Sequence, residues 1–321
     1  MEKHILGNTG IEVTPVGMGV LTVGRTQLNY SVEHGAELVR YALERGINFL
    51  DTAEYYETYP QIRLALKTAA ATVQVPVIAS KSLARDYRGM LAAVEDYRRT
   101  FDRDVADIFL LHEVREAPDF ESRAGAWECL NDLKAKGIIR AIGLSTHHVD
   151  AAKLNAELAE SDILFPLINK YGLGIRHGAG AGTAKEMAAA IRRNAERGKG
   201  VFAMKAFGGG NHVADYRAAL DYVRDLPGIS SIMVGLGTPE EVDRLIEYAE
   251  NRLADNYAPD ISEKTMRIDA GDCEGCGACI KRCPNKAISL SPAGVAEIDS
   301  AVCLTCGYCA PVCPTRALIM F

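Results

Sequence analysis

The cysteines of this 321-residue chain are distributed very unevenly, and their spacing limits what the last part of the chain can fold into. Eight of the nine belong to two runs near the C-terminus. Residues 273–283 read Cys-x-x-Cys-x-x-Cys-x-x-x-Cys before a proline, and residues 303–313 repeat this pattern before another proline. Ile-Asp at 268–269 also recurs at 298–299. We therefore interpret the segment as the duplication of one small unit.

The cysteine spacing favours a metal site over disulfide bonds, which are rare in cytosolic proteins. Two gaps of two residues let three thiolates converge on one cuboidal iron–sulfur cluster, and small residues between them let backbone N–H groups approach the sulfurs. A pair of zinc sites, each with four cysteine ligands, is the alternative, but zinc does not need the third close cysteine or the proline. The ninth cysteine, Cys129, lies in an apolar helical stretch and is expected to be a buried structural thiol.

The C-terminal segment, residues 264–321, resembles bacterial two-cluster ferredoxins, in which the cysteine before the proline ligates the other cluster. The resemblance implies a small α+β ferredoxin-like domain with two [4Fe–4S] clusters. One cluster would be held by Cys273, Cys276, Cys279 and Cys313, and the other by Cys303, Cys306, Cys309 and Cys283. Residues 255–263 are expected to form a linker to this domain.

The composition is that of an ordinary globular protein, with 48% hydrophobic and 24% charged residues. The net charge of −6 leaves no basic surplus to meet phosphates, so no nucleic-acid partner is expected. No apolar run approaches the about 18 residues that a membrane span needs, and residues 1–10 lack the layout of a signal peptide. We expect a cytoplasmic protein without membrane contact.

Residues 1–254 alternate short apolar runs with segments of helical periodicity. The predicted strands are Val13–Gly17, Ile47–Leu50, Val75–Ser80, Asp107–Leu111, Arg140–Leu144, Ile163–Ile168, Gly200–Met204 and Ser230–Val234. Helices are predicted, for example, at Val32–Arg45, Arg88–Phe101, Arg123–Lys136, Ala184–Arg197 and Pro239–Asn251. This alternation predicts an α/β fold, a (β/α)8 TIM barrel. A Rossmann fold is the alternative, but Gly17-Met-Gly19 lacks the third glycine of that fingerprint. Ile5–Val13 is predicted to form a hairpin that closes the barrel bottom.

Polar residues follow four of the predicted strands. Asp51, Lys81, His112 and Ser145 occur at intervals of 30, 31 and 33 residues, about the length of one strand–helix unit. They would therefore lie on one rim, at the C-terminal ends of the strands, where barrel active sites are found. Taken singly, each has a structural explanation, such as helix capping by Asp51 or core packing by His112.

At these positions the sequence resembles the aldo-keto reductase family. Phe49–Tyr56 reads Phe-Leu-Asp-Thr-Ala-Glu-Tyr-Tyr, similar to the signature in which the catalytic tyrosine follows the aspartate by five positions. Further similar segments are Ala79–Lys81 and Leu110–His112 for the family's lysine and histidine, Gly143–Thr146 for its Gly-x-Ser-Asn cofactor segment, and Met204–Gly210 for a glycine-rich loop of some branches. The similarity extends from the hairpin to about residue 254.

The resemblance implies hydride transfer between NADH or NADPH and a small carbonyl or alcohol substrate. Tyr56 would donate the proton to the nascent alkoxide, and Lys81 would lower the pKa of Tyr56. Asp51 would hold Lys81 charged and oriented, and His112 would fix the carbonyl oxygen. Tyr55 is the rival phenol, and the five-residue spacing favours Tyr56.

The same resemblance implies the cofactor contacts. Ser145, Thr146 and Asn169 would hold the carboxamide, although Thr146 stands where the family usually has Asn. The residues expected near the pyrophosphate and adenosine are Lys205, Gly208, Gly209, Gly235, Gly237 and Thr238. Many NADPH-using relatives carry a Lys or Arg after the last strand, where this chain has Gly-Thr-Pro at 237–239. NADH therefore stays open beside NADPH.

The two halves pose a problem of electron number, because a hydride carries two electrons and each cluster passes one. We interpret the clusters as a relay between an outside redox protein and the barrel site, with a structural role as the plainer alternative. Two other functions stay open at this point. The chain could be an electron carrier with a non-catalytic barrel, or a reductase that contains a flavin.

Overall fold

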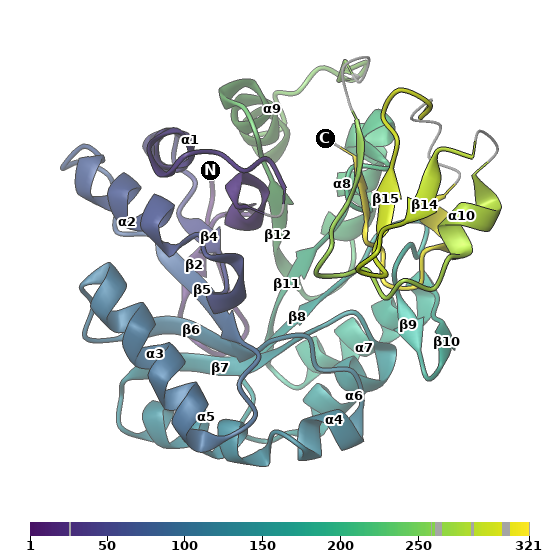
Figure 1. Ribbon diagram of the computed structural model, residues 1–321. Coiled ribbons are helices and arrows are strands. Elements are labelled where there is room, and N and C mark those ends of the chain that lie inside the picture. The colour runs from purple at the N-terminus through teal and green to yellow at the C-terminus, as the bar shows by residue number, and fades with distance from the viewer. Residues whose placement is uncertain (26, 258, 261–264, 284–285, 304–308, 321) are drawn as a thin grey trace.

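The structure is a computed structural model of residues 1–321, which describes all of them except 26, 258, 261–264, 284–285, 304–308 and 321. Eight parallel strands form a closed barrel in the order β11-β12-β3-β4-β5-β6-β7-β8. They are β3 (Val16–Gly19), β4 (Phe49–Asp51), β5 (Val77–Ser82), β6 (Ala106–Leu111), β7 (Ile139–Thr146), β8 (Ile163–Pro166), β11 (Gly200–Met204) and β12 (Ile229–Gly235). The predicted barrel is thus confirmed (Figure 1).

Helices surround the barrel and cover its outer face (Figure 1). They are α1 (Val32–Glu44), α2 (Tyr59–Thr68), α3 (Tyr87–Phe101), α4 (Ala117–Glu121), α5 (Ala124–Ala135), α6 (Val149–Glu157), α7 (Ala184–Glu196), α8 (Tyr216–Arg224) and α9 (Pro239–Ala249). Polar caps fix where several of them begin: the side chains of Ser31, Asp86, Thr183 and Thr238 each accept a backbone N–H of the first turn. Their buried faces form one large cluster with the outward-facing strand residues.

The bottom of the barrel is closed by a hairpin of β1 (His4–Ile5) and β2 (Glu12–Val13), as predicted. Leu6, Ile11 and Val13 of this hairpin are fully buried in the cluster that fills the barrel interior. The first barrel strand begins later than predicted, at Val16. Val13 is already paired with His4 in the hairpin, and Pro15 has no N–H to donate to a ladder.

The C-terminal domain consists of two short antiparallel pairs. β13 (Met266–Ile268) pairs with β16 (Leu318–Met320), and β14 (Ile288–Leu290) pairs with β15 (Ala296–Ile298). The helical turns α10 (Ala278–Arg282) and η4 (Ala310–Val312) lie between these strands in the chain. Its small core contains cysteines from both runs and also Leu173, a residue of the barrel.

The C-terminal domain docks on the barrel through the side that carries β13 and β16, near the β9–β10 hairpin (Arg176–His177 and Gly180–Ala181; Figure 1). Arg316 is the central contact and is 1% exposed. A Cβ on Gly174 would lie 2.6 Å from Cδ of Arg316, and one on Gly209 would lie 2.7 Å from its Nη1. Both glycines have positive φ, so the two backbones form a slot that a side chain would close.

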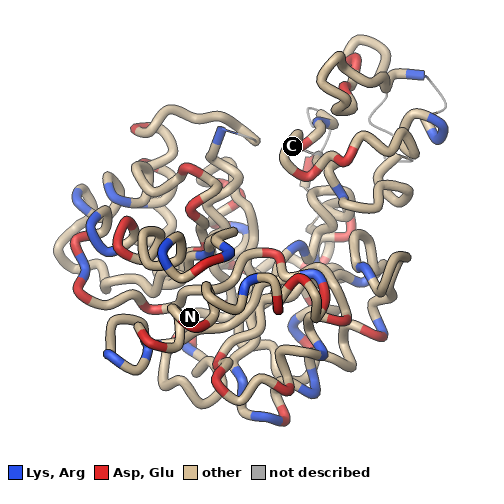
Figure 2. Tube along the Cα trace, turned by 60° about the horizontal axis from the view of Figure 1, so that its bottom comes forward, with Lys and Arg blue, Asp and Glu red and all other residues tan. Residues whose placement is uncertain are grey.

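The surface carries both signs of charge. In Figure 2 lysine and arginine are interspersed with aspartate and glutamate along the outer helices. Among the described residues, no helix is long and apolar enough to cross a membrane.

Candidate active site and cluster cavities

Asp51 and Lys81 form a buried ion pair at the C-terminal rim. Asp51 is the last residue of β4 and Lys81 lies in the neighbouring strand β5. The Lys81 ammonium donates to Asp51 Oδ1 at 2.8 Å, to Oδ2 at 3.1 Å and to the Thr52 carbonyl at 2.6 Å. Burial lowers the pKa of Lys81 and raises that of Asp51, while each charge opposes the shift of the other. Three acceptors thus satisfy an ammonium that is fully buried.

Tyr56 and His112 complete a cluster with this pair. Tyr56 belongs to the short helical turn Glu54–Tyr56, and its hydroxyl lies 3.3 Å from Nε2 of His112. The Lys81 ammonium lies 4.6 Å from the centre of the Tyr56 ring. Tyr55, the rival phenol, is 49% exposed and its hydroxyl points toward Gly271 of the C-terminal domain. The structure therefore groups Tyr56, not Tyr55, with Asp51, Lys81 and His112.

The acid–base properties of this cluster differ from the expectation. Burial raises the pKa of Tyr56 well above its ordinary value, and the carboxylates of Asp51, Asp272 and Glu113 raise it further. The predicted lowering of this pKa by Lys81 does not appear in the net shift, which is upward. The Lys81 ammonium is offset by the two-point contact with Asp51 and lies over the ring, so burial dominates.

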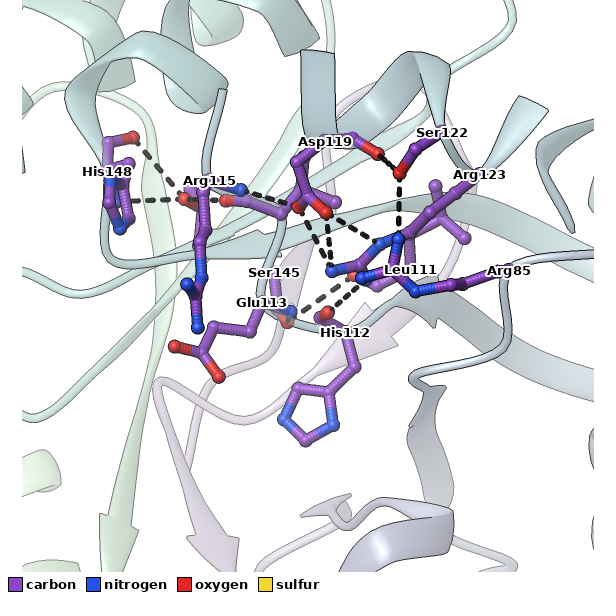
Figure 3. Close-up of polar contacts among 12 residues, drawn as sticks. Arg85, Leu111, His112, Glu113, Arg115, Asp119, Ser122, Arg123, Ser145 and His148 are labelled. Carbon is purple, nitrogen blue, oxygen red and sulfur yellow. Dashed lines mark hydrogen bonds and ion pairs between the residues drawn. The ribbon is translucent and has the colours of Figure 1, made fainter. Parts of the chain in front are cut away.

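His112 is held by a turn that neighbouring residues fix in place. The Arg123 guanidinium donates to the His112 carbonyl at 2.7 Å and pairs with Asp119, and the Glu113 N–H donates to Ser145 Oγ at 2.9 Å. Figure 3 shows the His112 ring and the Glu113 carboxylate on one side of this turn, away from the Asp119–Arg123 pair. Burial and the charge of Lys81 lower the pKa of His112 well below its ordinary value, so its imidazole is neutral at neutral pH.

The side chains predicted to hold the carboxamide are buried beside the cluster. Ser145 accepts the Glu113 N–H, and the Thr146 hydroxyl donates to the Val114 carbonyl at 2.5 Å. Asn169 donates to the Leu173 carbonyl at 2.9 Å and accepts its N–H at 2.9 Å. The polar atoms of Thr146 and Asn169 thus hold loops together in this structure.

The remaining predicted cofactor residues lie on the rim beyond β11 and β12. Gly208 and Gly209 follow β11 with positive φ. Gly235 ends β12, the Gly237 N–H donates to Glu241 at 2.7 Å, and Thr238 caps α9. Lys205, which follows β11, lies 3.9 Å from Asp272 of the C-terminal domain.

Four residues near the mouth were not singled out by sequence reasoning. Glu113, Asp269 and Asp272 act electrostatically on Tyr56, and Arg316 fills the docking slot. Asp269 and Arg316 have counterparts at the same place in the other cysteine repeat, Asp299 and Lys286. The sequence repeat could therefore have drawn attention to them, but it does not show which copy faces the barrel.

A small cavity in the C-terminal domain brings together cysteines from both runs. It is lined by Cys273, Cys276 and Cys279 of the first run and by Cys313, the last cysteine of the second. Backbone N–H groups donate to two of these sulfurs, from Ala296 to Cys273 at 3.4 Å and from Ala317 to Cys313 at 3.2 Å. Such contacts stabilise anionic sulfur, so the residues fit an iron–sulfur cluster.

The other predicted ligand set is described in part, because Cys306 lies outside the described residues. Burial raises the pKa of Cys309 to about 11, and the neighbouring Cys283 and Cys303 contribute to the increase. The Ala287 N–H donates to the Cys283 sulfur at 3.3 Å, in the same way as Ala317 to Cys313. Cys129 is fully buried in the barrel core, as expected.

Comparison with known proteins agrees with the two-part organisation. Residues 15–165 match the model of the Aldo/keto reductase family, and residues 272–317 match that of the 4Fe-4S dicluster domain. The solved aldo-keto reductase of Bacillus halodurans in its holo form has a TM-score of 0.63 at 18% identity. The match covers 78% of this chain and 94% of that one, and it shows the fold.

Two curated relatives resemble the barrel in sequence. Glyoxal reductase of Bacillus subtilis (strain 168) is 28% identical over 171 residues, which are 51% of this chain and 55% of the relative. Methylglyoxal reductase DkgA of Yersinia pestis is 30% identical over 143 residues, 44% of this chain and 50% of the relative. The chain thus spans about half the length of the curated relatives it matches.

Proposed function

The chain joins an aldo/keto reductase domain to a 4Fe-4S dicluster domain, and from this premise we propose that it is an oxidoreductase for small carbonyl compounds. The reaction is NAD(P)H-linked hydride transfer at the barrel mouth. The observation that carries the proposal is the grouping of Tyr56, His112 and the Asp51–Lys81 pair on one rim. Relatives named as reductases of glyoxal and methylglyoxal suggest a small, neutral carbonyl as substrate.

Tyr56 acts as the proton donor. A phenol is protonated at neutral pH and burial favours this form further, so Tyr56 holds a proton that it can donate to the nascent alkoxide. The neutral imidazole of His112 lies beside the phenol hydroxyl and orients the carbonyl oxygen. The Lys81 ammonium, fixed by Asp51, stabilises the phenolate that forms.

The cofactor side of the proposal rests on residues around the same rim. A bound nicotinamide supplies the hydride. Ser145 lies next to the His112 turn and would hold the carboxamide, and the glycines after β11 and β12 let a dinucleotide approach the backbone. No basic residue occupies positions 237–239, so NADH and NADPH are both to be tested.

The C-terminal domain would hold two [4Fe–4S] clusters and pass electrons between a redox partner protein and the barrel. Each cluster would take one electron, so the two electrons of one NAD(P)H would reduce both clusters and release one proton. In support, the cavity lined by Cys273 belongs to the side of the domain that touches the rim through Asp272 and Lys205. Anaerobic titration of the protein with NADH and then NADPH, followed by cluster absorbance, tests the relay. Absorbance that never responds to either nucleotide, or zinc in place of about eight irons, would contradict it.

A matched pair of tyrosine variants tests the barrel chemistry. Tyr56→Phe should lower the rate of glyoxal reduction by about 10²- to 10⁴-fold, the usual contribution of a general acid. Tyr55→Phe should stay within about twofold, because Tyr55 points to the C-terminal domain. Rates are measured anaerobically with each nucleotide. Full activity of Tyr56→Phe would overturn the assignment of the acid.

A further inference from the structure

The loop between β13 and the first cysteine reaches the barrel mouth. The Asp272 carboxylate lies 3.9 Å from the Lys205 ammonium, which follows strand β11. On the other side of the mouth, a Cβ on Gly271 would come within 2.5 Å of the Tyr55 hydroxyl. Residues 269–272, named here the acidic wall, thus extend between two loops that follow barrel strands.

The acidic wall is fixed in this place by the rest of the domain. The Asp269 N–H donates to the Ala317 carbonyl at 2.7 Å, which ties the wall to the strand that follows Arg316. Arg316 is held between Gly174 and Gly209 of the barrel, and Arg176 donates to the Pro314 carbonyl at 3.2 Å. These contacts therefore hold the acidic wall in a fixed position at the barrel mouth.

The acidic wall changes the charge at the mouth. The barrel residues there are the cations Lys81, Lys205 and Arg115 and the carboxylates Asp51 and Glu113. Asp269 and Asp272 add two more carboxylates, which makes the mouth more negative by two charges. Lys81 and Lys205 already lie against Asp51 and Asp272. Glu113 and the buried Asp269 are not paired with these lysines, and both raise the pKa of Tyr56.

We propose that the acidic wall is a specificity element that the C-terminal domain adds to the barrel site, selecting neutral or cationic carbonyl substrates over anionic ones. The inference rests on the proposed reductase function and concerns the same site. A carboxylate or phosphate near the reacting carbonyl would be brought next to Glu113 and Asp269, which repel it in a partly dry mouth. A neutral dicarbonyl avoids this cost.

The test compares glyoxal with glyoxylate, which are nearly equal in size but differ by one negative charge. The measured quantity is the ratio of kcat/KM for glyoxal to that for glyoxylate, at pH 8 under anaerobic conditions. In Asp269→Asn this ratio should fall by about five- to tenfold, because one repelling charge is removed while the amide oxygen still accepts the Gly271 N–H. Raising the salt concentration should lower the ratio of the unchanged protein in the same direction.

The other cysteine repeat provides the control. Asp299 makes the same turn, accepting the Ala301 N–H at 2.9 Å where Asp269 accepts that of Gly271 at 3.0 Å, but it is exposed. Asp299→Asn should leave the ratio unchanged. If Asp269→Asn does not load iron normally, Asp272→Asn removes the neighbouring charge and should lower the ratio as well.

Three results would overturn the inference. The ratio of Asp269→Asn and Asp272→Asn could equal that of the unchanged protein in preparations with normal iron content. Asp299→Asn could change the ratio as much as Asp269→Asn does. A protein that reduces no carbonyl at all would remove the proposed function together with this inference, and it is recognised by the absence of any rate with glyoxal.

Discussion

Asp269 and Asp299 make the same turn in the C-terminal domain, yet they lie in different surroundings. Asp269 is buried at the barrel mouth and Asp299 is exposed. The same holds for Arg316, which is 1% exposed in its slot, and Lys286, which is exposed. We call residues 266–273 and 313–320 the docked side and residues 286–303 the distal side. Each side combines pieces of both sequence repeats.

This comparison shows what docking requires of a repeated unit. Both sides keep the turn aspartate. The second residue after each Cys-Pro pair, Lys286 or Arg316, also has positive φ. The docked side differs where the barrel touches it: it has Gly271 and Asp272 where the distal side has Ala301 and Val302. The common unit thus positions the cysteines, and the differences between the copies build the contact with the barrel.

The largest expected difference concerns the cysteines. Cys279→Ser and Cys309→Ser should each lower the iron content from about eight to about four per chain, because each removes one ligand of one predicted cluster. Only Cys279→Ser should also lower kcat/KM for glyoxal, by about tenfold or more, because the acidic wall directly precedes Cys273 of the same set. Iron analysis and anaerobic kinetics measure both effects. Equal loss of activity in the two variants would break the comparison.

Acid should destabilise the docked side before the distal side, because the docked side contacts the barrel. Burial lowers the pKa of His112 and His147 well below 6.5, so below that pH the unfolded chain binds protons that the folded chain does not. The free energy of unfolding should therefore fall as the pH falls below about 6.5, by roughly 1 kcal/mol per pH unit for each histidine.

Hydrogen exchange at pH 7 and pH 5 checks this prediction. As the pH falls, the protection of backbone amides against exchange should decrease in β13 and in the barrel mouth before it decreases in β14 and β15. All seven histidines lie in residues 1–254, so nothing comparable titrates within the distal side. A decrease that begins on the distal side would show that the barrel does not control docking.

A smaller difference in the free energy of unfolding is expected between substitutions of Arg316 and Lys286. Arg316→Ala should lower the free energy of unfolding by about 2 kcal/mol, because it leaves a cavity in a buried contact. Lys286→Ala should change it by less than about 0.5 kcal/mol, as for other exposed positions. Urea unfolding under anaerobic conditions measures both values.

Arg316→Met sharpens this result. The Nε and Nη2 atoms of Arg316 have no hydrogen-bond partner among the described residues, so a side chain of similar volume without charge should be tolerated or stabilising by up to about 1 kcal/mol. A loss for methionine as large as that for alanine would mean that the guanidinium itself stabilises the folded protein, as it would by meeting an anion.

The smallest expected effect concerns Gly271. A Cβ at this position would lie 2.5 Å from the Tyr55 hydroxyl, the movable end of a side chain, so Gly271→Ala should weaken docking by only about 0.5–1 kcal/mol. Adding Tyr55→Phe should restore most of this loss, since it removes the atom in conflict. Thermal unfolding of the single and double variants gives the coupling energy. If the two substitutions changed the free energy of unfolding additively, the contact between residue 271 and Tyr55 would be contradicted.

Much of the fold could be predicted from sequence because barrel strands are short, apolar and evenly spaced. All eight predicted strands overlap observed ones. The first strand was predicted to begin too early because Val13 pairs with His4 in the hairpin. Asp51, Lys81 and His112 could be placed on one rim by the same periodicity, because each lies at or just beyond the C-terminal end of a strand. The grouping with Tyr56 needed a family resemblance, since a helical turn positions that residue.

The contact between the two domains could not be predicted. It depends on which side of a nearly symmetric unit faces the barrel, and the two cysteine runs are identical in spacing. The slot for Arg316 is formed by two glycines, Gly174 and Gly209, that are far apart in sequence. The pKa of Tyr56 depends on the same docking, because Asp269 and Asp272 contribute to it.

The hairpin that fills the barrel bottom has a consequence for the order of events. Leu6, Ile11 and Val13 are fully buried and fill the lower end of the barrel interior. With the C-terminal domain docked on the opposite rim, the nucleotide and the carbonyl of the proposed reaction would both enter there. The molecule that sits deeper has to arrive first and depart last, so steady-state kinetics should follow a compulsory sequence instead of random addition.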